Sequence, residues 1–180
     1  ENYRREKNGE QHISEHLDFG KTSFEQQQWV ELIDTGFLKE YSTDQIPPSW
    51  MYQKEFTEMI ESSVKDADEF NWYAWMHLGM IYIANKQFAD AKKALKRSIM
   101  LKESCWSYYG LANLARIEND KDKASSLALK ACEININDIS LVKETLNILI
   151  SAKKYDTALN LISKLKTDIQ KIKRIKLYKA

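Results

Sequence analysis

The strongest constraint on the fold is a pattern of large and small residues in 72–104 that specifies two packed helices. In its first half, four residues recur at relative spacings of 0, 3, 4 and 7, which places them on one helix face. These residues are Trp75, Leu78, Gly79 and Tyr82. A polar turn at 85–87 precedes a second helical pattern with Phe88, Ala91, Leu95 and Ser98. Because Gly79 and Ala91 are small, the two helices can lie antiparallel and in close contact.

The pattern returns at a shift of 31 residues, with Trp106 in the place of Trp75 and Gly110 in the place of Gly79. Its second helix carries alanines at 124, 128 and 131. A third, weaker unit lacks the glycine, so we expect its two helices to lie further apart. The predicted repeat region, 71–180, therefore divides into units at about 72–104, 105–136 and 137–167, with a truncated fourth unit at 168–180.

Composition agrees with a chain built only from helices. The 180 residues include 5 Gly and 2 Pro, too few for the many turns of a β-sandwich or barrel. Apolar residues make up 43% and charged residues 29%, which is typical of a soluble globular domain. The longest apolar run, 78–84, is far too short to span a bilayer. We predict an all-α, right-handed α-solenoid.

Residues 1–70 do not follow the repeat and predict a helical N-terminal cap. Ser23 is suited to cap a helix that runs to about Leu38, with an early end possible at Gly36. After a loop, Pro48 or Ser49 is expected to open a further helix that continues to about Val64. The polar residues 1–18 are expected to form a helix of modest stability.

The first unit resembles the tetratricopeptide repeat, a 34-residue helix–turn–helix. The family pattern of Trp, Leu, Gly and Tyr in the first helix, then Ala, an aromatic or Leu, and Ala in the second, is matched up to Ser98, which replaces the last Ala. Glu103 stands where the family has a closing Pro. The resemblance implies a solenoid whose first helices line a concave, partner-binding groove.

On this resemblance, the groove would be lined by eight residues of the first helices. They are Tyr73, Met76, Met80, Ile83, Ser107, Leu111, Lys143 and Asn147. Relatives that bind chaperone tails use a clamp of Lys, Asn and Arg here, but Met76 and Met80 replace the first Lys and Asn. A carboxylate clamp is therefore not expected. The apolar groove either binds a peptide or is filled by the N-terminal residues 1–64, and we favour filling because large exposed apolar patches are uncommon.

A second similarity covers most of residues 9–180 and rests on three stretches, 20–29, 46–51 and 72–79. They are similar to the C-terminal part of bacterial proteins in which a large β-rich, sugar-enzyme-like region of unknown function precedes tetratricopeptide repeats. The similarity implies that any catalysis would lie upstream of Glu1, so no catalytic residue is carried over to this chain.

No motif in the chain predicts catalysis, a cofactor or a metal site. His12, Glu15 and His16 form a His-x-x-Glu-His pattern that could bind zinc on a helix, but the flanking residues lack the apolar side chains that a catalytic cavity needs. Two solvated histidines on a surface helix are the expected alternative. Phosphate-binding loops and nucleophile elbows are absent from the sequence. Cys105 and Cys132 are expected to be buried, reduced thiols, which favours the cytoplasm.

Charge is unevenly distributed along the chain. Residues 1–70 carry 7 Lys and Arg against 16 Asp and Glu, a net charge of −9, whereas residues 71–180 carry 20 against 10, a net charge of +10. The basic stretch 164–179 could bind nucleic acid, but its interleaved isoleucines indicate an amphipathic helix with solvated lysines. We expect no nucleic-acid or membrane partner. The chain lacks an initiator Met and a signal peptide and stops inside a helical pattern, which we interpret as a fragment of a longer protein.

These observations together predict a non-catalytic module for protein interaction or scaffolding, which binds a protein, a peptide or another domain of the same parent chain. The alternative is an accessory helical module of a carbohydrate-active or sugar-binding enzyme whose catalytic part lies upstream.

Overall fold

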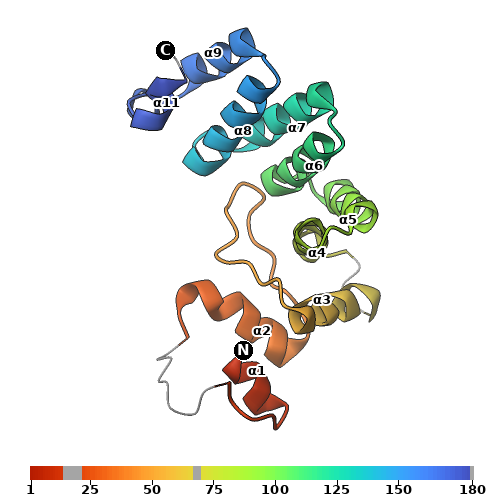
Figure 1. Cartoon of the computed structure of the whole chain (residues 1–180). Coiled ribbons are helices and arrows are strands. Elements are labelled where there is room, and N and C mark those ends of the chain that lie inside the picture. The colour runs from red at the N-terminus through yellow and green to blue at the C-terminus, as the bar shows by residue number, and fades with distance from the viewer. Residues whose placement is uncertain (14–21, 67–69, 179–180) are drawn as a thin grey trace.

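The computed structural model describes residues 1–13, 22–66 and 70–178. Within these ranges every regular element is a helix, and consecutive helices stack into a curved solenoid (Figure 1). The predicted all-α repeat fold is confirmed. The N-terminal helices lie at one end of the stack and the C-terminal helices at the other, so the chain ascends the solenoid in sequence order (Figure 1).

Three antiparallel helix pairs form the body of the solenoid. The first pair is α4 (Trp72–Ala84) and α5 (Phe88–Leu101), and the second is α6 (Cys105–Ile117) and α7 (Lys121–Ile134). The third pair is α8 (Ile139–Ser151) and α9 (Tyr155–Lys164). As expected for a unit without glycine, α8 and α9 approach each other less closely along their length than the helices of the first two pairs.

The three pairs share the same local signals at both ends of their first helices. Each first helix begins after a polar residue whose side chain accepts a backbone N–H of the first turn: Asn71, Ser104 and Asp138. Each ends in a turn with one left-handed residue, Lys86, Asn119 or Lys153, at φ of 61°, 60° and 60°. Because these turn residues stand 33 and 34 positions apart, the repeat length is visible in the backbone as well as in the side chains.

Close contact inside the first pair depends on Gly79, as the sequence indicated. A Cβ placed on Gly79 would lie 2.4 Å from Cγ of Leu95 and 3.3 Å from its backbone nitrogen. At Gly110 a Cβ would meet only the flexible ends of side chains, with the nearest atom, Cδ1 of Leu95, at 2.8 Å. Gly79 therefore lies where the helices approach most tightly.

We expect Gly79→Ala to lower the free energy of unfolding by about 2 kcal/mol, since overpacking in a dense core outweighs the better helix propensity of alanine. Gly110→Ala is the matched control and should cost about 1 kcal/mol or less, because the tips of Leu95 and Met80 can move. Urea denaturation followed by circular dichroism measures both. Equal losses for the two variants would contradict this interpretation of the Gly79 contact.

The N-terminal part forms a non-repeat cap, and its helices differ in extent from those predicted. Helix α1 (Asn2–Lys7) ends before the left-handed Gly9, while 14–18 lie outside the described residues. A 3₁₀ turn, η1 (Phe24–Gln26), follows Ser23 and continues into α2 (Gln27–Thr35). The left-handed Gly36, at φ 79°, ends α2 before Leu38 is reached.

The helix predicted to open at Pro48 or Ser49 is wrong, because α3 (Lys54–Asp66) begins five residues after Ser49. Residues 37–53 have no helix or strand and lie against α4 and α6 (Figure 1). The side chains of Ser49 and Trp50 contact residues distant in sequence, as described below. Tertiary contacts thus override the local signals for a helix start at Pro48.

The C-terminal residues do not form the single helix predicted for 168–180. The described part consists of two short helices, α10 (Thr167–Gln170) and α11 (Lys173–Leu177), with extended backbone at Ile172 between them. Ile169 and Ile175 are both buried. Residues six apart on one helix point about 120° away from each other, so the break lets both isoleucines face the same core.

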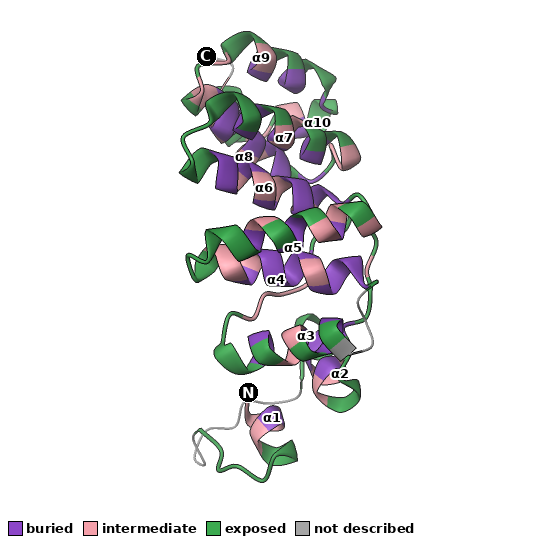
Figure 2. Ribbon diagram, turned by 90° about the vertical axis from the view of Figure 1, so that its right-hand side faces the viewer, coloured by how far each residue is buried: buried purple, intermediate pink, exposed green. Residues whose placement is uncertain are grey.

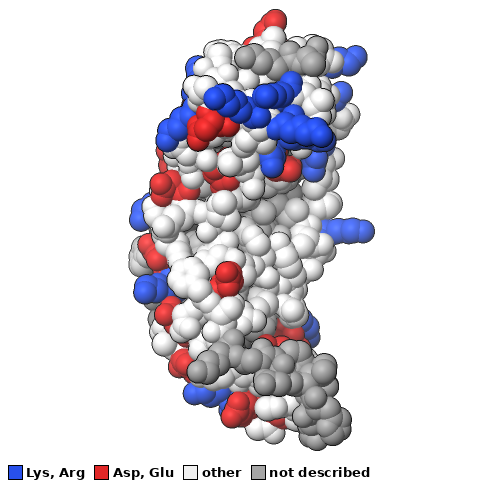
Figure 3. Space-filling model, turned by 90° about the vertical axis from the view of Figure 1, so that its left-hand side faces the viewer, with Lys and Arg blue, Asp and Glu red and all other residues white. Residues whose placement is uncertain are grey.

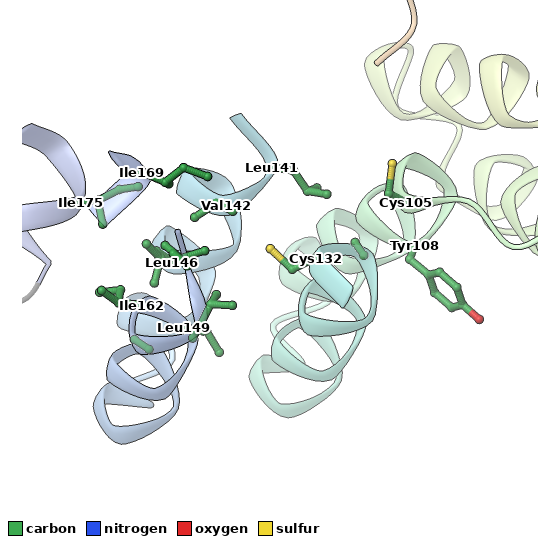
Figure 4. Packing of buried hydrophobic residues seen from close by; sticks show 14 residues of the cluster. Cys105, Tyr108, Cys132, Leu141, Val142, Leu146, Leu149, Ile162, Ile169 and Ile175 are labelled. Atoms are coloured by element: carbon green, nitrogen blue, oxygen red, sulfur yellow. The ribbon is translucent and has the colours of Figure 1, made fainter. Parts of the chain in front are cut away.

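The two largest of four hydrophobic cores in the described part hold the ends of the solenoid together, and Figure 2 shows the buried residues in purple along the helices. One core joins the cap to the first unit, with Trp29 of α2, Phe56 of α3 and Leu78 of α4 among its members. The other joins the second and third units to α10 and α11. Figure 4 shows Leu146 and Leu149 of α8 beside Ile162 of α9 in this second core.

Candidate partner-binding groove

Helices α4, α6 and α8 line the inner side of the curved stack, and residues 37–53 cross this side in an extended path (Figure 1). We call residues 37–53 the strap. The strap connects α2 to α3, so both of its ends are tied to the cap. It therefore occupies part of the surface that the sequence analysis assigned to a partner.

Ser49 fixes the end of the strap that lies against the cap. Its hydroxyl oxygen accepts a hydrogen bond from the indole Nε1 of Trp29 at 2.8 Å and donates to the carbonyl oxygen of Glu25. Its own carbonyl oxygen accepts from Nε2 of Gln28 at 2.9 Å. Gln28 in turn accepts the hydroxyl of Tyr73 at 2.7 Å, which links the strap, α2 and α4 into one buried network.

The rest of the strap is held by side chains and backbone of the repeat units. Nδ2 of Asn71 donates to the carbonyl oxygen of Leu38 at 2.6 Å, and the indole Nε1 of Trp72 donates to the Glu40 carboxylate at 3.0 Å. Further along, the backbone N–H of Cys105 donates to the carbonyl oxygen of Thr43 at 3.2 Å. The strap thus reaches from the first unit to the start of the second.

The tip of the strap contacts the end of the second repeat unit. Nδ2 of Asn135, just after α7, donates to the carbonyl oxygen of Asp44. The strap therefore touches all three first-helix layers or the turns that lead into them, and its main-chain carbonyls accept much as those of a bound extended peptide would.

Trp50 closes the strap over an aromatic cluster on α4 and α6. Its ring lies 4.8 Å from the ring of His77 and 6.1 Å from that of Trp106, measured between centroids. Nearer the start of the strap, the ring of Tyr41 lies 5.3 Å from that of Tyr73. Two aromatic side chains of the strap therefore anchor it on the inner face.

His77 lies beneath this cluster, fully buried and without a hydrogen-bond partner on either ring nitrogen. The rings of Trp29 and Tyr73 lie 5.2 and 4.5 Å from the imidazole, measured between centroids. With Trp50, they make three aromatic residues that surround it. Burial without a compensating charge lowers the pKa of His77 to about 3, so the imidazole is neutral at pH 7. His77 is therefore a neutral residue of the core.

The eight residues predicted to line the groove fall into two groups. Tyr73, Met76 and Ser107 are buried by the chain's own residues and offer no surface to a partner. Burial also raises the pKa of the Tyr73 hydroxyl, and Ser107 Oγ lies within hydrogen-bond distance of the hydroxyls of Ser98 and Ser104. The remaining five are half-buried: Met80, Ile83, Leu111, Lys143 and Asn147.

Asn147 in the third unit is also engaged by the chain itself. Its side-chain oxygen accepts the hydroxyl of Tyr178, which also accepts a hydrogen bond from Nε of Arg174 at 3.1 Å. The structure thus does not gather the eight residues into one open groove. Of these five residues, Met80, Ile83 and Leu111 are half-buried side chains of α4 and α6, and we call them the strip.

The other candidates in the sequence do not assemble a chemical site. His12 is exposed, while Glu15 and His16 lie outside the described residues. Across the described ranges, no group of three or more His, Cys, Asp or Glu side chains could hold a metal ion. Cys105 and Cys132 are buried free thiols, and burial raises their pKa values to about 12 and 11, so neither is a nucleophile near neutral pH.

Charge on the inner face is concentrated at one end. Figure 3, which views the left-hand side of Figure 1, shows few charged side chains over the middle of the molecule and Lys and Arg side chains over the end that carries the C-terminal helices. The basic residues of α11 and its surroundings, including Lys171, Lys173 and Lys176, are exposed. Their separation across two short helices replaces the single amphipathic helix expected for this stretch.

Sequence reasoning favoured filling of the groove by residues 1–64 and expected a loop before Pro48, but it missed the anchors of the strap, Ser49, Trp50 and Asn135. One signal for an extended, anchored segment was available in the sequence. Pro47 and Pro48 favour extended backbone in the residue before each of them, and the large aromatic Trp50 lies two residues after Pro48. The partners of Trp50 on α4 and α6 lie 27 and 56 residues away in sequence, so no local pattern connects them.

Comparison with known proteins identifies the first helix pair. Residues 73–105 match the family model of the tetratricopeptide repeat. Curated protein sequences contain no significant match to the chain. The matched segment ends at Cys105, the first residue of α6, and gives no support to an upstream sugar-enzyme-like domain. Among the described helices, none has the length and apolar character needed to cross a membrane. The chain is therefore one that contains a tetratricopeptide repeat, formed by α4 and α5.

Proposed function

We propose that this chain is a non-catalytic interaction and scaffolding module that binds an extended polypeptide segment on its inner face. Tetratricopeptide repeats generally mediate protein–protein interaction, and the repeat at 73–105 supplies the fold for this role. The partner is another protein or another part of the same parent chain. A role beside an upstream sugar-processing domain stays a prediction that no contact in the structure favours.

The observation that carries the proposal is the strap itself. An extended segment with two consecutive prolines lies on the inner face, where Trp50 packs on His77 and Trp106, and its carbonyls at Thr43 and Asp44 accept hydrogen bonds from the repeats. The face therefore has the shape and donors to hold an extended polypeptide. The half-buried strip of Met80, Ile83 and Leu111 continues this face beyond the strap.

The test separates the strap from the chain. In one variant, residues 39–52 are replaced by a Gly/Ser linker of equal length, and a fluorescein-labelled peptide of residues 37–53 is titrated against it. We expect saturable binding by fluorescence anisotropy, because the peptide can occupy the surface from which the strap was removed. The same peptide with Trp50→Ala is the matched control and should bind at least tenfold more weakly, since the lost aromatic anchor is worth more than about 1.4 kcal/mol.

Circular dichroism of the linker variant shows whether the helices remain intact. Retained helices without peptide binding would overturn the proposal. If the linker variant does not fold, the intact Trp50→Ala chain described in the Discussion supplies the open face for the same titration.

A further inference from the structure

The cage around His77 is incomplete without the strap. Trp29 comes from α2 and Tyr73 from α4 itself, while Trp50 is the ring that the strap contributes. Both imidazole nitrogens are buried and lack hydrogen-bond partners, so a positive charge on His77 would have no acceptor in the closed state. Removal of Trp50 from its place would open one side of the cage to water.

The strap is the segment of this face whose opening would expose the cage. It has no regular secondary structure, and several of its residues, including Ile46 and Tyr52, are exposed. The Cys105 amide, at the first position of α6, has no partner within its own helix and donates to Thr43 of the strap instead. Irregular backbone and exposed side chains are typical of segments that open locally.

We propose that the strap is an autoinhibitory segment that closes the inner face, and that protonation of His77 opens it. This inference rests on the proposed function, because it names how access to the same face is controlled. In the closed state, the strap occupies the place of an extended partner segment. In the open state, His77 reaches water and the face becomes available.

The sign of the effect follows from the two states of the imidazole. In the closed state the pKa of His77 is about 3, whereas a solvated histidine has a pKa near 6.5. Between these values the open state binds more protons, so closure weakens as pH falls below about 6.5 and recovers above it. For full solvation on opening, closure is expected to weaken about 25-fold between pH 7 and pH 5.

The surroundings of His77 contain no charge that competes with this effect. Of the rings that meet the imidazole, Trp29 and Trp50 do not titrate. Tyr73 is the titratable neighbour; burial raises the pKa of its hydroxyl, and that hydroxyl is bonded to the neutral side chain of Gln28. All three neighbours therefore stay neutral between pH 5 and pH 7.

Hydrogen exchange of the Cys105 amide, measured by NMR on the full chain, tests the proposal. After correction for the intrinsic pH dependence of exchange, its protection should fall about 25-fold from pH 7 to pH 5. An amide inside α7, such as that of Ala128, is the internal reference and should keep its protection. In His77→Phe, and in His77→Gln as a second variant, the Cys105 amide should keep the same protection at both pH values.

Three other outcomes would contradict control of the strap by His77. Unchanged protection of the wild-type Cys105 amide at pH 5 would show that His77 does not control the strap. A parallel loss at Ala128 would show acid unfolding of the solenoid, and the same fall in both His77 variants would assign the effect to another group. Because no peptide is present, failure here leaves the peptide titration of the proposed function unaffected, and the two proposals are judged separately.

Discussion

Replacement of Trp29 by alanine is expected to lower the free energy of unfolding by about 4 kcal/mol, near the middle of the range for a buried tryptophan. Its side chain is 2% exposed and meets the ring of Phe56 at 5.6 Å and that of His77 at 5.2 Å, both edge to face. Its indole nitrogen also donates to Ser49. One side chain thus joins α2, α3, α4 and the strap, and its loss leaves a cavity at their junction.

Urea denaturation followed by far-ultraviolet circular dichroism measures this loss. Phe24→Ala is the matched control, because Phe24 lies at the start of the same helical segment but is 74% exposed. The control should change the free energy of unfolding by less than about 0.5 kcal/mol. A loss below about 1 kcal/mol for Trp29→Ala would contradict the central position of this residue in the cap core.

The second large effect concerns access to the inner face. Trp50→Ala removes the ring that packs on His77 and Trp106 and is expected to weaken closure of the strap by about 3 kcal/mol. A competing peptide binds only those molecules in which the strap is open, so its apparent affinity is proportional to the open fraction. The intact Trp50→Ala variant should therefore bind the labelled 37–53 peptide up to roughly 100-fold more tightly than the wild-type chain. Fluorescence anisotropy measures both affinities.

The control for Trp50 is Tyr52→Ala, which removes an aromatic side chain from the same strap. Tyr52 is 45% exposed, so its loss should change peptide affinity by less than about threefold. Equal affinities of the wild-type and Trp50→Ala chains would show that Trp50 does not hold the strap closed. A rise in affinity for both variants would show that closure depends on the strap as a whole rather than on the Trp50 anchor.

The repeat region could be predicted in detail because its information is local. Trp75, Leu78, Gly79 and Tyr82 lie within one helix, and the polar caps and turns that bound each helix are neighbours in sequence. Helical periodicity therefore determines which face is buried before any distant contact is known. The close approach at Gly79 could be predicted from the same pattern. A glycine on the buried face of a helix lacks a Cβ, and this lets the partner helix come close, as Leu95 does in the packed pair.

The candidate site was only partly accessible to the same reasoning. The groove residues were assigned from helical position alone, which cannot say whether a face is open. Tyr73 proved to be buried where Tyr41 of the strap meets its ring, and Met76 proved to lie in the core that joins the cap to the first unit. The helix expected at Pro48 did not form because Ser49 and Trp50 have partners on α2, α4 and α6. A segment that gains its contacts from residues 20 to 91 positions away carries no periodic signal of its own.

By itself, the sequence determined the helices, their pairing and the small residues that let them approach, because each of these depends on contacts between near neighbours in the chain. The tertiary structure alone decided that the strap is the segment that covers the inner face, that His77 is buried without a partner, and that the C-terminal stretch breaks so that Ile169 and Ile175 reach one core. These features depend on which distant side chains compete for the same space, and that competition is settled only when the whole chain is packed.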